Sequence, residues 1–225
     1  MKWSTVATGV ASLAVSVLAQ TDSTPVADAD TGITFQSFTS EEGITYGLAL
    51  PEDAGSDAAF DAIIQIISPV TNGWAGWAWG GQMTYNPLTV VWADGDSVVY
   101  SSRQALGYYL PAAYEDATYT VFEQGTSVNE THFKLTALCS GCTSWTDFDG
   151  NPYFLNGEGD ASFAYAYSTT AVEEPANQDS GFSIHDTVGR WTHDLAGARS
   201  ADFATWVDSN KAPAAAYSAQ PSGRY

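Results

Sequence analysis

One methionine follows a pair of glycines in the stretch Trp-Ala-Gly-Trp-Ala-Trp-Gly-Gly-Gln-Met-Thr-Tyr-Asn-Pro, residues 74–87. The chain has 2 methionines and the other is the initiator, so Met83 is the single thioether of a processed chain. Such a side chain has two interpretations. It can fill a gap in an apolar core, or it can be a soft axial ligand of a metal cofactor, where glycines let a flat macrocycle lie against the backbone.

Three histidines could supply an imidazole: His132, His185 and His193. His185 follows Phe182 and Ile184 in a predicted loop, so an apolar rim surrounds it. His132 is predicted at a hairpin end on the surface, and His193 lies among polar residues and is predicted to be solvated. No two histidines have the close spacing typical of zinc or mononuclear copper sites. Taken alone, His185 is more often a plain loop histidine than a metal ligand, and both interpretations stay open at this point.

Two cysteines, Cys139 and Cys142, are separated by one serine and one glycine. In a secreted chain this spacing favours a disulfide that closes a small loop. A thioredoxin-type redox site is less favoured because no βαβ pattern surrounds the pair. Thr143 stands where covalent attachment of a c-type haem requires a histidine, so a haem in this chain would be held non-covalently.

Short strands are predicted to position these side chains. Each shows alternating apolar and polar residues or a dense apolar run, over residues 33–36, 44–50, 60–67, 88–92, 97–100, 119–123, 131–138 and 163–167. Asp94-Gly95 is predicted as the turn of one hairpin and Gln124-Gly125 as the turn of another. A short capped helix is predicted at residues 200–207. This pattern predicts an all-β, antiparallel β-sandwich with a short C-terminal helix.

The tryptophan-rich stretch is itself predicted to begin as a strand. Trp77 and Trp79 would project from one face, and Ala78 and Gly80 from the other. Gly80-Gly81 would end the strand, because paired glycines permit backbone angles and close approaches that other residues do not.

Composition and the chain ends limit the possible functions. The chain has 225 residues and a formal net charge of −19, which argues against nucleic acids and anionic membrane surfaces as partners. Residues 1–19 resemble a signal peptide, which predicts secretion, and no later apolar run is long enough to span a bilayer. One domain is expected at residues 20–208, followed by a linker-like tail at 209–225. Asn129 begins a glycosylation sequon, Asn-Glu-Thr, at a predicted surface hairpin.

Several segments follow one another in an order that resembles a known family. They are Trp-Ala-Trp-Gly-Gly-Gln-Met at 77–83, the Asp94-Gly95 turn, Gly107-Tyr108 with Pro111, Cys-Ser-Gly-Cys at 139–142 and Phe-Ser-Ile-His at 182–185. Together they resemble the N-terminal cytochrome domain of cellobiose dehydrogenase and its stand-alone relatives, secreted haem b proteins of fungi. The similarity runs from about residue 32 to residue 207.

The resemblance implies an immunoglobulin-like β-sandwich that binds one haem b. It implies Met83 and His185 as the axial iron ligands and Tyr108 near a haem propionate. It also implies that Cys139 and Cys142 form a disulfide. With both axial positions filled, the chemistry left to the iron is outer-sphere transfer of single electrons.

The expected function is therefore that of a secreted, monomeric b-type cytochrome that catalyses no reaction by itself. The resemblance implies an extracellular flavin or quinone dehydrogenase as electron donor. It implies a metalloenzyme such as a copper-dependent polysaccharide monooxygenase as acceptor. The alternative function is that of a cofactor-free, carbohydrate-binding β-sandwich that uses Trp74 or Trp145 as sugar platforms.

Overall fold

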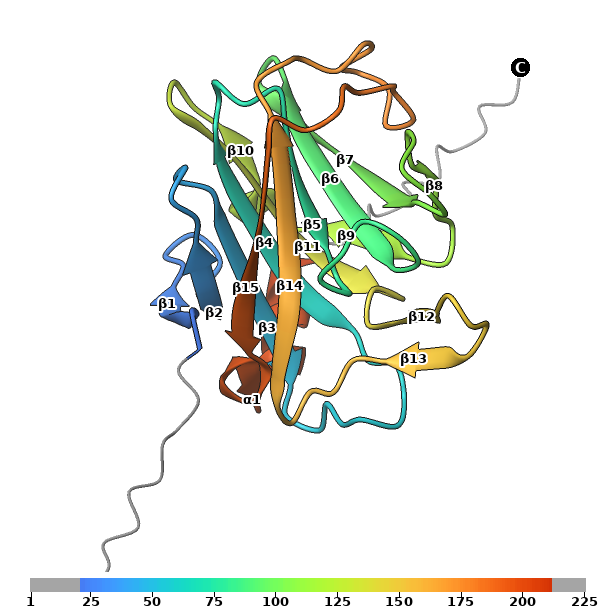
Figure 1. The fold of residues 1–225 in the computed structure, drawn as a ribbon. Helices are drawn as coiled ribbons and strands as arrows, with labels where there is room; N and C mark the ends of the chain where they lie inside the picture. Colours follow the sequence, from blue (N-terminus) through green and yellow to red (C-terminus); the bar gives the residue numbers. More distant parts are fainter. Residues whose placement is uncertain (1–20, 212–225) are drawn as a thin grey trace, which may run out of the picture.

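In a computed structural model, which describes residues 21–211, the chain forms two β-sheets packed face to face (Figure 1). The eight-stranded sheet has the order β1-β2-β3-β4-β11-β10, with β9 paired to β11 and β16 paired to β3. Its strands are β1 (Thr24–Ala27), β2 (Thr34–Thr39), β3 (Thr45–Pro51), β4 (Ala62–Pro69), β9 (Thr118–Val121), β10 (Ser127–Val128), β11 (His132–Ser140) and β16 (Arg199–Ser200).

The six-stranded sheet has the order β15-β14-β5-β6-β7-β8 and is antiparallel throughout. Its strands are β5 (Trp74–Ala78), β6 (Pro87–Asp94), β7 (Ser97–Gln104), β8 (Ala112–Ala113), β14 (Asp160–Ser168) and β15 (Thr187–Asp194). A separate hairpin of β12 (Ser144–Thr146) and β13 (Pro152–Phe154) lies beside this sheet (Figure 1). The predicted β-sandwich is thus confirmed.

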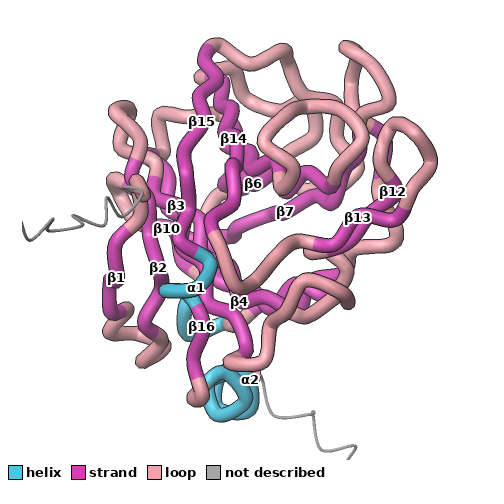
Figure 2. The backbone as a smooth tube through the Cα atoms, turned by 60° about the horizontal axis from the view of Figure 1, so that its bottom comes forward, coloured by secondary structure: helices cyan, strands magenta, loops and turns pink. Residues whose placement is uncertain are grey.

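Short helices lie near one end of the sandwich (Figure 2). They are the 3-10 helix η1 (Glu123–Gly125) and the α-helices α1 (Leu195–Ala198) and α2 (Phe203–Asn210). Phe203 and Val207 of α2 pack against Ile33 and Phe35, as expected of the predicted C-terminal helix. The helix includes residues 209 and 210 of the expected tail. Residues 212–225 of that tail lie outside the described residues, as does the expected signal peptide. No helix within residues 21–211 has the length and apolar character needed to cross a membrane.

The interior of the sandwich is filled by aromatic rings. Trp77 stacks on Trp79 with ring centroids 4.9 Å apart, and both side chains are buried. The edge of Trp77 meets Tyr46 at 5.7 Å and Phe163 at 5.1 Å. The prediction that Trp77 and Trp79 share one face of the strand is therefore confirmed, as is the end of β5 just before the glycine pair.

Two predicted turns lie elsewhere than expected. In the β6–β7 hairpin Asp94 pairs with Ser97, so Gly95 and Asp96 form the loop, and Gly95 alone has a positive φ, of 59°. In the second hairpin β9 and β10 both pair with β11, and the chain turns at residues 129–131. The predicted turn at Gln124-Gly125 is instead η1, in which Gly125 lies so close to Thr136 that a Cβ would be 2.8 Å from the Thr136 side chain.

The structure contains a strand that the sequence analysis did not predict. Residues 187–194 form β15, which pairs with β14 along its whole length. Trp191 and His193 point inward and are buried, whereas Arg190 is exposed and Thr192 partly so. The prediction that His193 is solvated was wrong, because alternate side chains of a strand take opposite faces and the polar neighbours of His193 lie on the outer one.

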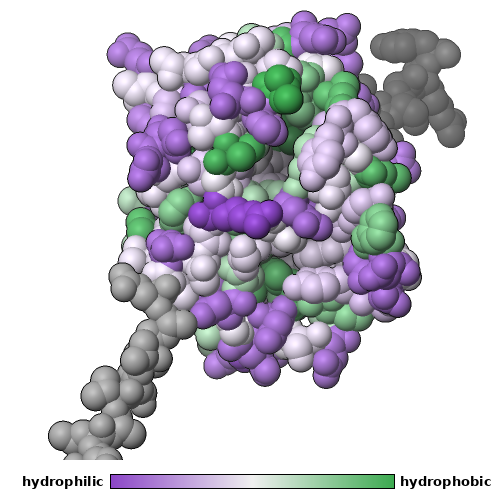
Figure 3. Space-filling model, viewed as in Figure 1, coloured by the Kyte–Doolittle hydropathy of each residue, from purple (hydrophilic) through white to green (hydrophobic). Residues whose placement is uncertain are grey.

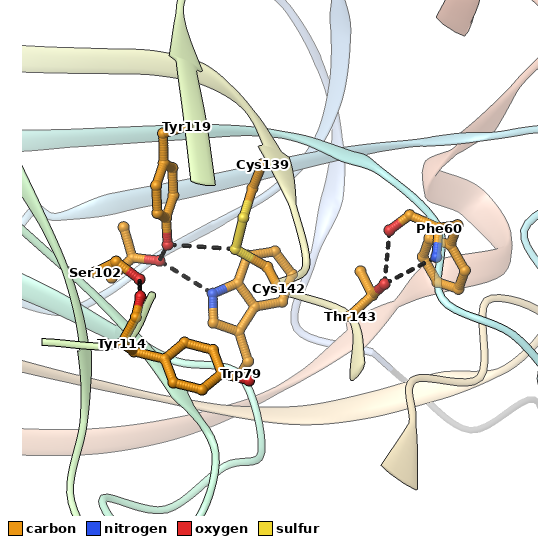
Figure 4. Close-up of a disulfide and its surroundings, with 9 residues drawn as sticks. Phe60, Trp79, Ser102, Tyr114, Tyr119, Cys139, Cys142 and Thr143 are labelled. Carbon is orange, nitrogen blue, oxygen red and sulfur yellow. Dashed lines mark hydrogen bonds between the residues drawn. A yellow bond between two sulfur atoms is a disulfide. The ribbon is translucent and has the colours of Figure 1, made fainter. Parts of the chain in front are cut away.

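The disulfide between Cys139 and Cys142 is present, with Cα atoms 6.0 Å apart (Figure 4). The sulfur of Cys142 lies 3.3 Å from the hydroxyl oxygen of Tyr119, which is 2.7 Å from the hydroxyl oxygen of Thr89. Thr89 in turn accepts a hydrogen bond of 3.0 Å from the indole nitrogen of Trp79. This connected chain fixes Trp79, and with it the start of the segment that carries Met83.

Candidate cofactor site

The outer face of the six-stranded sheet carries unusually small side chains at its centre. On β5 the outward positions are Trp74, Gly76 and Ala78, because the alternate residues Ala75 and Trp77 belong to the interior cluster. Ala78 pairs with Ala164 of β14, and Gly76 pairs with Ala166. Four small residues therefore form a contiguous floor, which we call the outer floor: Gly76, Ala78, Ala164 and Ala166.

The glycine at the centre of the outer floor is not required by the packing of the chain. A Cβ placed on Gly76 would come no closer than 3.4 Å to any neighbouring atom, which is an ordinary van der Waals contact. By contrast, a Cβ on Gly73 would lie 2.0 Å from the backbone oxygen of Thr170. A small side chain at position 76 would therefore fit on the sheet, with the ring of Trp74 as its nearest neighbour.

Met83 lies at one end of the outer floor. Its side chain is partly buried against Ala78, Leu88, Ala105 and Ala164. The loop that carries it is held by Asn86, whose side-chain oxygen accepts from Gly80 N at 2.9 Å and whose amide nitrogen donates to the carbonyl oxygens of Gln82 and Thr84 at 2.8 Å. The thioether is therefore held at the surface of the outer face and does not fill the interior core.

His185 lies at the other end, in the long loop between β14 and β15. Phe182 of this loop packs on Trp74, with ring centroids 5.1 Å apart, and Ser183 donates to Ser168 at 3.1 Å. The neighbour of His185, Asp186, accepts hydrogen bonds from the backbone N and the hydroxyl of Thr169, and these bonds lower the pKa of its carboxyl. The loop is thus folded over the outer face, and His185 is partly buried.

Arg103 connects the loop after β7 with the loop between β14 and β15 through hydrogen bonds. This buried guanidinium donates to the carbonyl oxygens of Pro111 at 3.1 Å, Gln178 at 3.1 Å and Ser180 at 2.9 Å. Burial lowers the pKa of Arg103, and the charge of Asp179 opposes that effect. Within residues 21–211 Arg103 forms no salt bridge. These hydrogen bonds, together with one from its Nε to the hydroxyl of Ser101, compensate the burial of the cation.

Other features of this face suit a flat, mainly apolar ligand. The indole nitrogen of Trp74 is buried and has no hydrogen-bond partner among the described atoms. Two exposed apolar residues belong to this face: Val188, which pairs with Ala166 of the outer floor, and Ile184, which precedes His185. Seen from the side of β14 and β15, the molecule shows exposed hydrophobic residues beside a hollow in its upper half (Figure 3). Exposed apolar side chains gathered at a concave site mark a binding surface.

The remaining predicted site residues have different settings. Tyr108 is 90% exposed in the loop after β7 and contacts neither Met83 nor His185 through any hydrogen bond or ring contact among the described residues. Asn129 lies exposed in the β10–β11 turn, as expected of a usable sequon, and its glycosylation stays a prediction. His193 is excluded from the outer face, since its Nδ1 accepts a hydrogen bond of 2.9 Å from Trp191 in the interior.

Sequence reasoning missed the outer floor and Arg103. The alternation of Ala164 and Ala166 with Phe163 and Tyr165 was visible in the sequence, but it indicated only a strand. That these alanines face the same way as Gly76 follows from the pairing of β14 with β5. In the part of the chain that the structure describes, no three His, Cys, Asp or Glu residues gather as a metal-binding group.

Comparison with known proteins matches this chain to one family. A family model described as the cytochrome domain of cellobiose dehydrogenase matches residues 26–205. The pyrroloquinoline quinone-dependent pyranose dehydrogenase of Coprinopsis cinerea is 31% identical over 175 residues, which is 76% of this chain. The chain spans only 23% of the length of that relative.

Two solved structures have the same fold. The cytochrome b domain of pyranose dehydrogenase from Coprinopsis cinerea superimposes with a TM-score of 0.76 at 28% identity, covering 84% of this chain and 96% of that domain. The cytochrome domain of Myriococcum thermophilum cellobiose dehydrogenase superimposes with a TM-score of 0.77 at 29% identity, covering 87% of this chain and 99% of that domain.

Proposed function

Because the chain belongs to the family of cytochrome domains of cellobiose dehydrogenase, a family of haem b electron-transfer modules, we propose that Met83 and His185 are its axial iron ligands. The observation that carries this proposal is the outer floor. It offers a shallow, apolar surface with a thioether segment at one end and an imidazole segment at the other. Non-covalent binding follows from Thr143, which replaces the histidine of a covalent attachment motif.

A haem b bound here supplies a one-electron ferric/ferrous couple. Met83 and His185 would occupy both axial positions, which leaves no open position for oxygen or a substrate. A thioether opposite an imidazole favours the ferrous state more than two imidazoles do, and so raises the reduction potential. Gly76 and Ala166 would let a flat group lie close to the sheet, because neither carries a large side chain. Tyr108 and Arg103 are proposed to face the propionate side, Tyr108 by a hydrogen bond and Arg103 through its charge.

The function proposed for the whole chain is single-electron transfer outside the cell. The donor would be an extracellular flavin or quinone dehydrogenase, and the acceptor a metalloenzyme such as a copper polysaccharide monooxygenase. The relatives support the donor class, since the matched regions are domains of dehydrogenases. A formal charge of −19 favours partners with a cationic docking face. The alternative of a cofactor-free sugar binder built on Trp74 or Trp145 loses support, because both indoles are buried.

A visible spectrum tests the ligand assignment. The purified protein is expected to show a low-spin haem b spectrum whose Soret band shifts on reduction with dithionite. Met83→Ala is expected to lose the low-spin features and to lower the reduction potential, because an axial thioether is removed. His185→Ala is expected to lose haem or its low-spin character.

His132→Ala is the matched control, because this histidine lies on β11 of the other sheet, and it should leave the spectrum unchanged. A colourless wild-type protein would refute haem binding altogether. An unchanged low-spin spectrum in Met83→Ala or His185→Ala would refute that residue as a ligand while leaving the family assignment intact.

A further inference from the structure

An open cleft lies on the side of the Met83 loop that faces away from the outer floor. It has a volume of about 300 Å³ and lies between the Trp79–Asn86 segment, the β12–β13 hairpin and the start of β14. A second hollow of about 530 Å³ adjoins it and shares four of its lining residues, Tyr85, Trp145, Asp147 and Tyr153. We call the two together the aromatic cleft. The β12–β13 hairpin that borders it projects beside the six-stranded sheet (Figure 1).

Two aromatic rings in the aromatic cleft are exposed yet held in place. Phe148 is 73% exposed, and the edge of its ring contacts Tyr85 at a centroid distance of 5.0 Å. Tyr153 is 44% exposed and stacks on the buried Trp145 at 4.4 Å. Each exposed ring therefore has a second ring behind or beside it that restrains its orientation. Rigid, exposed aromatic rings supply contact area to a ligand at a small cost in conformational entropy.

Polar groups with unused hydrogen-bonding capacity surround these rings. The carboxylate of Asp160 has no hydrogen bond among the described residues. Asn156 accepts from Glu158 N at 3.0 Å through its side-chain oxygen, which leaves its amide nitrogen free to donate. Gln82 donates to Thr84 O, which leaves its side-chain oxygen free to accept. The cleft thus offers both donors and acceptors to hydroxyl groups.

The charge of the lining limits the ligand class. Asp116, Asp147 and Asp160 line the aromatic cleft, and none of its described lining residues is a lysine or arginine. Phosphorylated or carboxylated ligands would therefore meet repulsion without a compensating cation. A sugar ring that carries no charge fits better, because its C–H face packs on an aromatic ring while its hydroxyl rim hydrogen-bonds to carboxylates and amides.

The loop that forms one wall of the cleft is held in a fixed conformation without any ligand. Tyr85 has a φ of 58°, and it is the one non-glycine residue in the left-handed region among residues 21–211. Tyr85 N donates to Ala105 O at 2.9 Å, and Asn86 fastens the same loop from within. A strained backbone held by surrounding bonds is typical of binding sites. The ligand then binds without having to order the loop.

We propose that the aromatic cleft binds an uncharged oligosaccharide, with Phe148 and Tyr153 as sugar platforms and Asp160 and Asn156 as hydroxyl partners. This site is distinct from the outer floor and does not depend on haem binding. It would hold the cytochrome on a polysaccharide surface with the Met83 loop facing that surface.

Isothermal titration calorimetry on the purified full-length protein tests the proposal. The probes are cellohexaose, xylohexaose, mannohexaose and chitohexaose, with oligogalacturonate and a short polylysine as charged comparisons. At least one uncharged hexasaccharide is expected to bind with saturable heat. Tyr153→Ala and Phe148→Ala should each weaken that binding about tenfold or more, as truncation of an aromatic anchor does.

Two further variants separate the contribution of the aromatic ring from that of the carboxylate. Tyr153→Phe keeps the ring and should retain most of the affinity, whereas Asp160→Asn should reduce it. Val26→Ala, an exposed apolar residue of the other sheet, is the matched control and should change nothing. Circular dichroism and the Soret band report whether each variant is folded and loaded with haem.

The proposal is overturned if none of the four hexasaccharides binds, or if their binding is insensitive to Tyr153→Ala and Phe148→Ala. Binding of polylysine alone, abolished by Asp160→Asn, would also overturn it and would assign the cleft to a cationic polypeptide. Failure of haem binding would leave these outcomes unchanged, so the two proposals are tested separately.

Discussion

The two faces of the six-stranded sheet differ in side-chain size although the same strands form both. On the inner face β5 and β14 present Trp77, Phe163 and Tyr165 to the interior, where they pack against other rings. At the centre of the outer face the alternate positions of these strands hold Gly76, Ala78, Ala164 and Ala166, with the large ring of Trp74 at one end of β5. The inner face is filled by large rings, whereas the centre of the outer face presents only small side chains beside Met83. A single alternating pattern thus encodes a core and a receptor surface together.

The difference matters because packing and binding make opposite demands. A core residue stabilises the fold through contacts that would be lost on truncation. A residue of a binding floor stabilises the complex by being small, so enlarging it should affect the guest more than the fold. Substitutions on the two faces are therefore expected to separate stability from cofactor binding.

The largest effect on stability is expected at Trp77. Trp77→Ala should lower the free energy of unfolding by about 3–5 kcal/mol, because a large buried ring is removed and a cavity is left. Trp77→Phe should cost clearly less, since it keeps a ring and removes an indole nitrogen that has no partner among the described atoms. Urea unfolding followed by circular dichroism measures both. A loss below about 1 kcal/mol in Trp77→Ala would contradict the view that this ring organises the inner face.

A smaller, pH-dependent effect is expected at His193 on the same inner face. Burial lowers the pKa of this imidazole to about 3, from an ordinary value of 6.5. The unfolded chain therefore binds a proton more readily than the folded one, and stability should fall as the pH drops from about 6.5 towards 3. The slope approaches about 1.4 kcal/mol per pH unit.

His193→Asn keeps an acceptor for the indole of Trp191 and cannot titrate in this window, so it should lose that part of the slope. His132→Asn, which alters a partly exposed histidine, should retain the wild-type slope. The measurement is the free energy of unfolding between pH 4.5 and 6.5. Its slope against pH reports how many more protons the unfolded chain binds than the folded one. Equal slopes in wild type and His193→Asn would show that another group carries the dependence.

The smallest effect on stability is expected at Gly76 on the outer floor. Gly76→Ala should leave the fold unchanged or stabilise it by about 0.5–1 kcal/mol, because the added Cβ fits and a strand glycine is replaced. Gly76→Leu should in contrast reduce haem occupancy, because it places a large side chain on the outer floor between the segments of Met83 and His185. The ratio of Soret to protein absorbance measures this. Full haem occupancy in a folded Gly76→Leu would show that the guest does not lie over the outer floor.

Hydrophobic periodicity alone reveals some strands of this fold and hides others. The strands at 44–50, 60–67 and 163–167 were predictable because their apolar residues alternate or cluster without interruption. The strand at 187–194 was missed because Arg190, Thr192 and Asp194 occupy outer positions and a histidine occupies one of the inner ones. A buried neutral histidine and a solvated histidine look the same in a sequence. Only the pairing of β15 with β14 separates them.

The sequence by itself determined the local chemistry of this protein. It supplied a thioether directly after a glycine pair, a histidine in an apolar loop, a cysteine pair three positions apart and strands of alternating character, all of which depend on neighbouring residues. Tertiary structure decided which of these groups share a surface. Gly76 and Ala166 are 90 positions apart in the chain, yet sheet pairing places them side by side and turns both away from the core. Arg103 likewise joins Pro111 to Ser180 only because two loops fold over one face. The physical reason is that side-chain direction is set by the local backbone, whereas the partner facing it is set by long-range strand pairing.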